Sequence, residues 1–164
     1  MAQADAALSD AQKILLRQAE AARVASEGNP YTFGGQTIEG FDCSGFVIYV
    51  FNQAYGSNTL LRVTAEDLRT EGRFAAVASP GAPCDLIFFS SSAGSSTAAH
   101  VGIVVDSTRW IGSQSSTGVA YVSLSNVYWR PRILSYGRYQ PLRVAQSIIP
   151  SRAGSFASII NPTA

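Results

Sequence analysis

The stretch from residue 41 to residue 48, Phe-Asp-Cys-Ser-Gly-Phe-Val-Ile, constrains the fold more than any other part of the chain. It places Cys43 where an extended segment turns into a strongly apolar helix, and such a helix is expected to be buried against a sheet. Backbone N–H groups and the dipole at a helix start stabilise a thiolate and so lower the pKa of a cysteine. The stretch therefore predicts a nucleophilic thiol at the start of a core helix, although an ordinary buried cysteine also suits this place.

The single histidine of the chain, His100, follows Cys43 in the chain order of a papain-like nucleophile and base. Small residues precede it and the apolar run 101–105 follows, so we expect it at the head of a strand, where its imidazole can face Cys43. The alternative is a histidine on the surface or in the core whose ring is hydrogen-bonded and that takes no part in catalysis. One histidine and two distant cysteines do not make a zinc-ligand set, so we expect neither a metal nor another cofactor.

Length and charge indicate the kind of molecule that carries this pair. With 164 residues, 46% of them hydrophobic, the chain suits one compact domain, and we expect a monomer. Twelve basic residues against eleven acidic ones predict neither nucleic-acid binding nor attraction to a membrane, and favour a neutral or zwitterionic substrate. A disulfide to Cys84 would consume the reactive thiol, so Cys84 is expected to fill space as a small hydrophobe.

Helical patterns come first along the chain and strand patterns come later, which is typical of an α+β domain with an antiparallel sheet. The first helix is expected to bury an apolar face made of Leu15, Ala19, Ala22 and Val24. The segment 36–40 is expected to be a loop and 90–98 a surface connection. The expected helices cover 9–26, 43–55 and a short segment from 64, and the expected strands cover 85–89, 99–105, 110–114, 119–124 and 133–139.

A third polar group usually orients the histidine of such a pair, and Gln114 is our candidate. The strand 110–114 should lie beside the histidine strand, with Gly112 and Gln114 on one face and Ser113 on the other. The amide oxygen of Gln114 can accept the imidazole N–H. The alternative is a polar residue that merely ends a strand.

Four motifs occur in a recognisable order: Pro-Tyr-Thr-Phe-Gly-Gly at 30–35, Gly-Phe-Asp-Cys-Ser-Gly-Phe-Val at 40–47, Asp-Leu-Ile-Phe-Phe at 85–89 and His-Val-Gly-Ile-Val at 100–104. Together they resemble the NlpC-type peptidoglycan endopeptidases, a family of papain-like cysteine peptidases. The resemblance spans about residues 19 to 124. It implies a papain-like α+β domain in which N-terminal helices, with the nucleophile at a helix start, pack on an antiparallel sheet.

The resemblance also implies roles for individual residues. Cys43 would be the nucleophile and His100 the general base, with Tyr31 as the family's aromatic residue before the Gly-Gly pair. Asp42 and Ser44 would line the peptide-binding groove and hold the amine of a stem peptide. The oxyanion would be stabilised by the Cys43 N–H and by Tyr31. The implied substrate is the peptidoglycan stem peptide, cut between D-γ-glutamyl and diaminopimelate residues.

The chain departs from the family pattern at three points. The family's third catalytic position, often a histidine, falls on Gly112, and the glycine before Asp85 is replaced by Cys84. No signal peptide is visible, so we expect synthesis in the cytoplasm and action in the periplasm or cell wall of a target cell. This suggests an antibacterial effector with a cognate immunity protein, or a phage lytic enzyme.

The domain organisation is expected to be a peptidase domain over 1–140 and a C-terminal tail of unknown role over 141–164. Two other functions stay open on the sequence alone. One is acyl transfer or deamidation on a substrate outside the cell wall. The other is an inactive module that only binds stem peptides.

Overall fold

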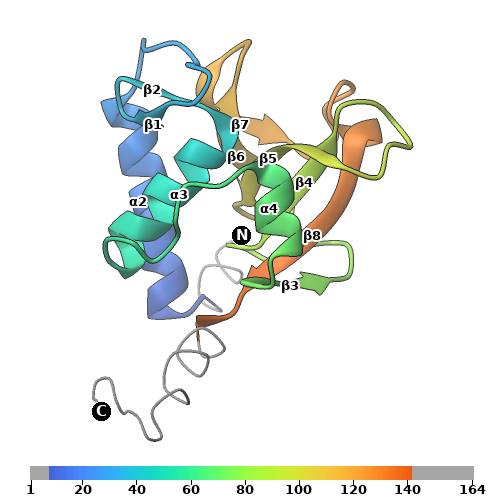
Figure 1. Ribbon diagram of the computed structural model, residues 1–164, viewed down its shortest axis with the longest axis horizontal. Helices are drawn as coiled ribbons and strands as arrows, with labels where there is room; N and C mark the ends of the chain where they lie inside the picture. Colours follow the sequence, from blue (N-terminus) through green and yellow to red (C-terminus); the bar gives the residue numbers. More distant parts are fainter. Residues whose placement is uncertain (1–7, 142–164) are drawn as a thin grey trace, which may run out of the picture.

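The computed structural model describes residues 8–141, and there it has three α-helices and a six-stranded antiparallel sheet. Helix α3 (Cys43–Tyr55) lies between helix α2 (Asp10–Ala25) and the sheet, and helix α4 (Ala65–Thr70) packs on strand β5 (Figure 1). This confirms the α+β class with the cysteine helix against the sheet. The predicted tail, 141–164, lies outside the described residues except for Pro141.

Each helix begins where a side chain caps its first turn. Ser9 and Gln12 form a capping box at α2, Thr64 and Asp67 form another at α4, and the carboxylate of Asp42 caps α3. A cap of this kind stabilises a helix by about 1 kcal/mol because it satisfies a backbone N–H that has no partner within the helix.

The buried face of α2 consists of Leu15, Ala19 and Ala22, as predicted. Val24 was wrongly assigned to this face, since 53% of its surface is exposed. It follows Ala22 by only two residues, which is about 200° around the helix and therefore turns its side chain toward solvent.

The sheet has the strand order β3-β8-β4-β5-β6-β7, and every neighbouring pair is antiparallel. All five predicted strands are present. Two predictions were incomplete: strand β3 was not expected, and the segment expected as a loop at 36–40 forms, with Phe41, a short hairpin of β1 (Gln36–Thr37) and β2 (Gly40–Phe41). The sheet strands are β3 (Phe74–Val77), β4 (Leu86–Ser90), β5 (Ala98–Val104), β6 (Arg109–Gln114), β7 (Gly118–Ser123) and β8 (Ile133–Tyr139), with a short 3-10 helix η1 (Arg130–Arg132) before β8.

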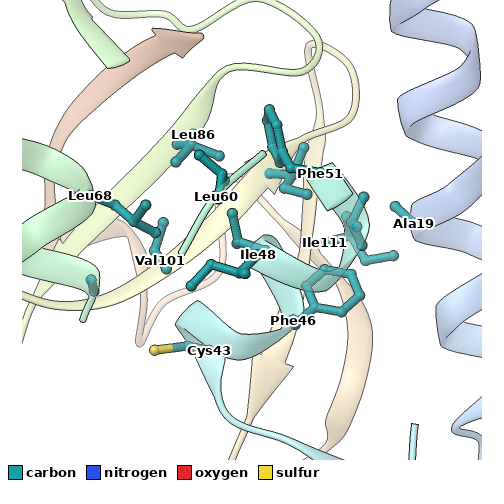
Figure 2. Packing of buried hydrophobic residues seen from close by; sticks show 14 of the residues in the cluster. Ala19, Cys43, Phe46, Ile48, Phe51, Leu60, Leu68, Leu86, Val101 and Ile111 are labelled. Atoms are coloured by element: carbon teal, nitrogen blue, oxygen red, sulfur yellow. The ribbon is translucent and has the colours of Figure 1, made fainter. Parts of the chain in front are cut away.

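Side chains alternate across the sheet and form two hydrophobic clusters, one on each face. The helix-side cluster joins α2, α3 and α4 to sheet residues such as Phe88, Val101 and Ile111. The far-side cluster is smaller and centres on Phe89 and Trp110. Figure 2 shows the helix-side cluster, with Cys43 at its edge and the sulfur directed away from Phe46.

Within residues 8–141, none of the helices combines the length and the apolar character that crossing a bilayer requires.

Candidate active site

Cys43 is the first residue of α3 and is 7% exposed. Asp42 caps the helix by accepting the Gly45 N–H at 2.6 Å. The preceding carbonyl, that of Phe41, accepts the hydroxyl of Ser113 at 2.9 Å, which ties the start of the helix to strand β6. Ser113 therefore points to the helix side of the sheet, as the predicted alternation requires.

Burial controls the charge state of the thiol. It raises the pKa of Cys43, and the negative charge of Asp42 acts in the same direction. The backbone N–H of Val101 and the N–H groups at the start of α3 oppose this rise, and the opposition is the smaller effect. The helix start does lower this pKa, as expected, but desolvation outweighs it, so the net shift is upward and the thiol is neutral at pH 7.

The structure brings His100 and Gln114 together. Strands β5 and β6 pair through Ile103 with Ile111 and Val104 with Trp110, and the same register continued by three residues sets His100 opposite Gln114. The amide oxygen of Gln114 lies 3.1 Å from His100 Nε2. The predicted hydrogen bond is thus present in the structure.

Gly112 explains how Gln114 reaches the imidazole. A Cβ built at Gly112 would lie 2.7 Å from the Gln114 Oε1 atom and 2.9 Å from the Trp110 ring. The amide therefore occupies space that a side chain at position 112 would need. Where the family pattern has a histidine, this chain has Gly112, and the side chain of Gln114, two residues later in the strand, occupies that space.

Aromatic rings surround the other sides of the imidazole. Trp129 stacks on His100 with ring centroids 4.6 Å apart, and Phe89 and Trp110 also contact it. Burial among them lowers the pKa of His100 to about 4, although the Gln114 hydrogen bond and the charge of Asp42 act in the opposite direction. The imidazole is therefore neutral at pH 7.

Cys43 and His100 lie close through the backbone of β5. The Val101 N–H, which follows His100 in the chain, approaches the Cys43 thiol and lowers its pKa. In the part of the chain that the structure describes, no hydrogen bond joins the thiol to the imidazole ring. The resting arrangement is thus a neutral thiol at the backbone N–H of Val101 and a neutral imidazole on the preceding residue, whose Nε2 is engaged by Gln114.

Tyr31 lies near Cys43, and its role at the oxyanion stays a prediction. The backbone N–H of Cys43 reaches the Tyr31 hydroxyl, whose pKa is raised by burial first and by the neighbouring Cys43 second. The Tyr31 hydroxyl therefore lies near both the backbone N–H and the thiol of Cys43.

Asp42 and Ser44 are both engaged by Arg62, a residue that the sequence analysis did not single out. The Arg62 guanidinium forms an ion pair with the Asp42 carboxylate and donates to the Ser44 hydroxyl at 2.7 Å. Asp42 also accepts the Gly34 N–H at 3.0 Å, so it connects the Gly-Gly loop, the helix start and Arg62. Arg62 lies just before the cap of α4, and only the tertiary fold places it here.

A cavity of about 530 Å³ lies over the β6–β7 turn and the Trp129 loop. Gln114, which hydrogen-bonds to the imidazole of His100, and Trp129, which stacks on it, both line this cavity. Trp129 was missed as well. Its loop is held by Asn126, whose Oδ1 accepts the N–H groups of Tyr128 and Trp129. Nowhere in residues 8–141 do three histidine, cysteine or acidic side chains cluster as metal ligands would.

Comparison with known proteins agrees with this architecture. A probable peptidoglycan endopeptidase, LytE, and a gamma-DL-glutamyl hydrolase, both from Bacillus subtilis, are 35% and 36% identical over 114 and 118 residues. These matches cover 68% and 71% of this chain but only 31% and 28% of the relatives, so the chain spans less than a third of their length. A lipoprotein-like NLP/P60 protein from Staphylococcus aureus has a similar structure, with a TM-score of 0.62 at 27% identity over 80% of this chain and 42% of that one.

The match to a family model covers the same region. Residues 28–138 fit the NlpC/P60 family, a range that includes Tyr31, Cys43, His100 and Gln114. Since this is more than half of the sequence, the chain belongs to the NlpC/P60 family.

Proposed function

We propose that this protein is a cysteine endopeptidase that hydrolyses an amide bond in the stem peptides of bacterial peptidoglycan. The observation that carries the proposal is the buried thiol of Cys43 at the start of α3. It lies at the backbone N–H of Val101, next in the chain to His100, whose Nε2 Gln114 engages. The relatives named as a peptidoglycan endopeptidase and a gamma-DL-glutamyl hydrolase support the same class of substrate.

In this mechanism His100 acts as the general base through Nδ1, because Gln114 engages Nε2. As the Cys43 sulfur attacks the carbonyl carbon, Nδ1 takes the thiol proton and an imidazolium forms. The imidazolium then protonates the leaving amine, which departs and leaves an acyl-enzyme. A water molecule, deprotonated by the same nitrogen, hydrolyses the thioester and restores the thiol.

The developing oxyanion would be stabilised by the Cys43 N–H and the Tyr31 hydroxyl, two groups that lie close together. Removal of one such donor typically lowers the rate about 100-fold or more. Gln114 would stabilise the imidazolium by accepting its Nε2–H, in the role that the family gives to a third residue.

Arg62 gives a reason to favour the D-γ-glutamyl bond. A glutamyl residue linked through its γ-carboxyl keeps a free α-carboxylate next to the bond that is cut. Arg62 supplies a cation that contacts the Ser44 hydroxyl, on the residue next to Cys43. The Asp42 carboxylate is already paired with Arg62. We therefore propose that Ser44 and Arg62 bind the α-carboxylate, while Asp42 holds Arg62 and caps α3. The binding of a peptide amine by Asp42 and Ser44 stays a prediction, as do delivery into a target cell and an immunity partner.

The test is mass spectrometry of purified muropeptides after incubation with the wild type, Cys43→Ala and Cys84→Ser. We expect wild type and Cys84→Ser to release a product cut after D-glutamate, and Cys43→Ala to release none. Cys84 is the matched control because it is the other thiol and lies against the Gln12 carbonyl at 3.4 Å, with Pro83 and Asp85 as its chain neighbours. Cleavage at another stem-peptide bond would keep the enzyme class and refute the bond, whereas no cleavage of any muropeptide by wild type would refute the function.

A further inference from the structure

A series of hydrogen bonds connects the β6–β7 turn to the imidazole. Gln114 Oε1 lies 3.1 Å from His100 Nε2, and the Gln114 amide nitrogen donates to the Thr117 hydroxyl oxygen at 3.2 Å. The Thr117 hydroxyl donates in turn to the carbonyl oxygen of Gly118 at 2.8 Å. The Thr117 N–H also donates to the Gln114 carbonyl at 3.2 Å and closes the turn.

The carbonyl of Gly118 fixes which group donates in each hydrogen bond of this series. A carbonyl oxygen only accepts hydrogen bonds, so the hydrogen of the Thr117 hydroxyl is committed to Gly118. The Thr117 oxygen must then accept from the Gln114 NH2 group, which turns the Gln114 amide oxygen toward His100. That oxygen cannot donate, so His100 Nε2 carries the proton and Nδ1 keeps its lone pair.

The opposite orientation of the Gln114 amide would reverse the chemistry. Its NH2 group would then face the ring, Nε2 would have to accept, and the proton would sit on Nδ1, where it could not receive the proton of a thiol. Such a flip breaks the hydrogen bond from the Thr117 hydroxyl to the Gly118 carbonyl oxygen, because the hydroxyl hydrogen would have to turn to the Gln114 amide oxygen. The net value of one hydrogen bond corresponds to a roughly twofold to tenfold preference.

We propose that Thr117 is a positioning residue that sets the tautomer of His100 through Gln114, leaving Nδ1 free to take the Cys43 proton. The catalytic use of this tautomer rests on the function proposed above. Thr117 itself contacts neither the thiol nor the imidazole and acts only through the amide. Thr117 lies in the turn between β6 and β7, where no strand alternation indicates which residue its side chain contacts.

The first experiment reads the tautomer directly by 15N NMR at neutral pH. His100 is the only histidine, so its two ring nitrogens give an unambiguous spectrum. We expect Nε2–H to predominate in wild type and in Thr117→Ser, which keeps the hydroxyl, and a mixture of roughly equal Nε2–H and Nδ1–H in Thr117→Val, which replaces it with a methyl group. Ser116→Ala is the matched control in the same turn, since the Ser116 side chain forms no hydrogen bond within the described residues. An unchanged Nε2–H tautomer in a folded Thr117→Val variant would refute the proposal.

Kinetics on muropeptides then test the consequence. We expect kcat to fall by up to about twofold in Thr117→Val, because the productive tautomer drops to about half of the molecules, to recover in Thr117→Ser and to stay unchanged in Ser116→Ala. The two proposals fail in different ways. Tautomer mixing in a protein that cleaves no muropeptide would refute the peptidase function alone, whereas active wild type with an unaffected Thr117→Val variant would refute the role of Thr117 alone.

Discussion

His100 and Cys43 are both held in their neutral forms by burial, and this decides where in the reaction the proton moves. Burial lowers the pKa of the imidazole to about 4 and raises that of the thiol. A thiolate–imidazolium pair would need the opposite shifts. The thiol proton should therefore transfer during attack on the substrate and not before it. Gln114 matters most at that moment, because its oxygen stabilises the imidazolium as it forms.

This arrangement predicts the acid limb of the pH–rate profile. His100 accepts a proton only when it is unprotonated, so kcat/KM should rise as pH rises through about 4 and be level by pH 6.5. In Gln114→Ala the plateau should fall roughly tenfold or more. Its acid limb should also move to still lower pH, because the Gln114 hydrogen bond raises the pKa of His100. Initial rates on one purified muropeptide from pH 3.5 to 8 measure both effects, and a wild-type limb centred near 6.5 would contradict a buried base.

Some site residues could be predicted from the sequence and others could not. Cys43, His100 and Gln114 lie in regular elements, where the start of a helix and the alternation of a strand say where a side chain points. Arg62, Thr117 and Trp129 lie in connections, and their contacts with the site depend on how the chain folds back. The helix start lowers the pKa of Cys43 as predicted, but the net rise could not be predicted because desolvation depends on packing that the sequence does not display.

At the scale of elements, the position of the thiol depends on a close contact between α3 and the Gly-Gly loop. The carbonyl oxygen of Gly35 accepts the Asp42 N–H at 3.0 Å, directly beside Gly45. A Cβ on Gly45 would overlap that oxygen and would also lie 2.8 Å from Asp42 Oδ1. Both atoms are fixed by hydrogen bonds, so the loop cannot yield without losing the cap of α3.

Gly45→Ala should therefore shift the start of α3. We expect a loss of about 1–3 kcal/mol in the free energy of unfolding from this overlap. Turnover should fall about 100-fold if the thiol moves by 1 Å. Urea unfolding and muropeptide hydrolysis measure the two effects. Gln53→Ala, on the exposed face of the same helix, should change stability by less than about 0.5 kcal/mol. Equal behaviour of the two variants would show that the contact at Gly45 is dispensable.

The elements that sequence analysis missed are those with little pattern of their own. Strand β3 is the four residues Phe-Ala-Ala-Val, too short and too weakly alternating to be distinguished from a loop. Pairing with β8 makes it a strand, in a register that sets Phe74 opposite Tyr139. The β1–β2 hairpin is likewise formed by two residues on each side. The longer strands were predictable because their β-branched and aromatic residues are bounded by turns.

For the molecule as a whole, the site lies along strand β5, which contributes side chains to the hydrophobic clusters on both faces of the sheet. Val101 belongs to the helix-side cluster, while the next residue back, His100, stacks among the aromatic rings of the far side. Strand β5 thus links both clusters to the site. Keeping a titratable ring in such surroundings makes the stability of the fold depend on pH.

The sign of this dependence follows from the two states of His100. Its pKa is about 4 when folded and about 6.5 when unfolded, so the unfolded chain binds the extra proton first as pH falls. The stability that neutral His100 preserves is therefore complete above about pH 6.5 and is lost progressively down to about pH 4. At pH 5 the loss should be about 2 kcal/mol. The pKa of Glu20 is lowered to about 2, chiefly by its hydrogen bond with Arg23. The stability that this carboxylate contributes is therefore lost only below about pH 4.5.

Urea unfolding at pH 7 and pH 5 tests this for the wild type and His100→Gln. We expect the wild type to lose about 2 kcal/mol between the two pH values and His100→Gln to lose much less, because glutamine has no proton to gain. The variant should be less stable than the wild type at pH 7, since a side chain of different shape disturbs the stack on Trp129. The difference between the two pH values, and not the absolute stability, is the quantity that matters. Parallel losses in both proteins would assign the acid sensitivity to groups other than His100.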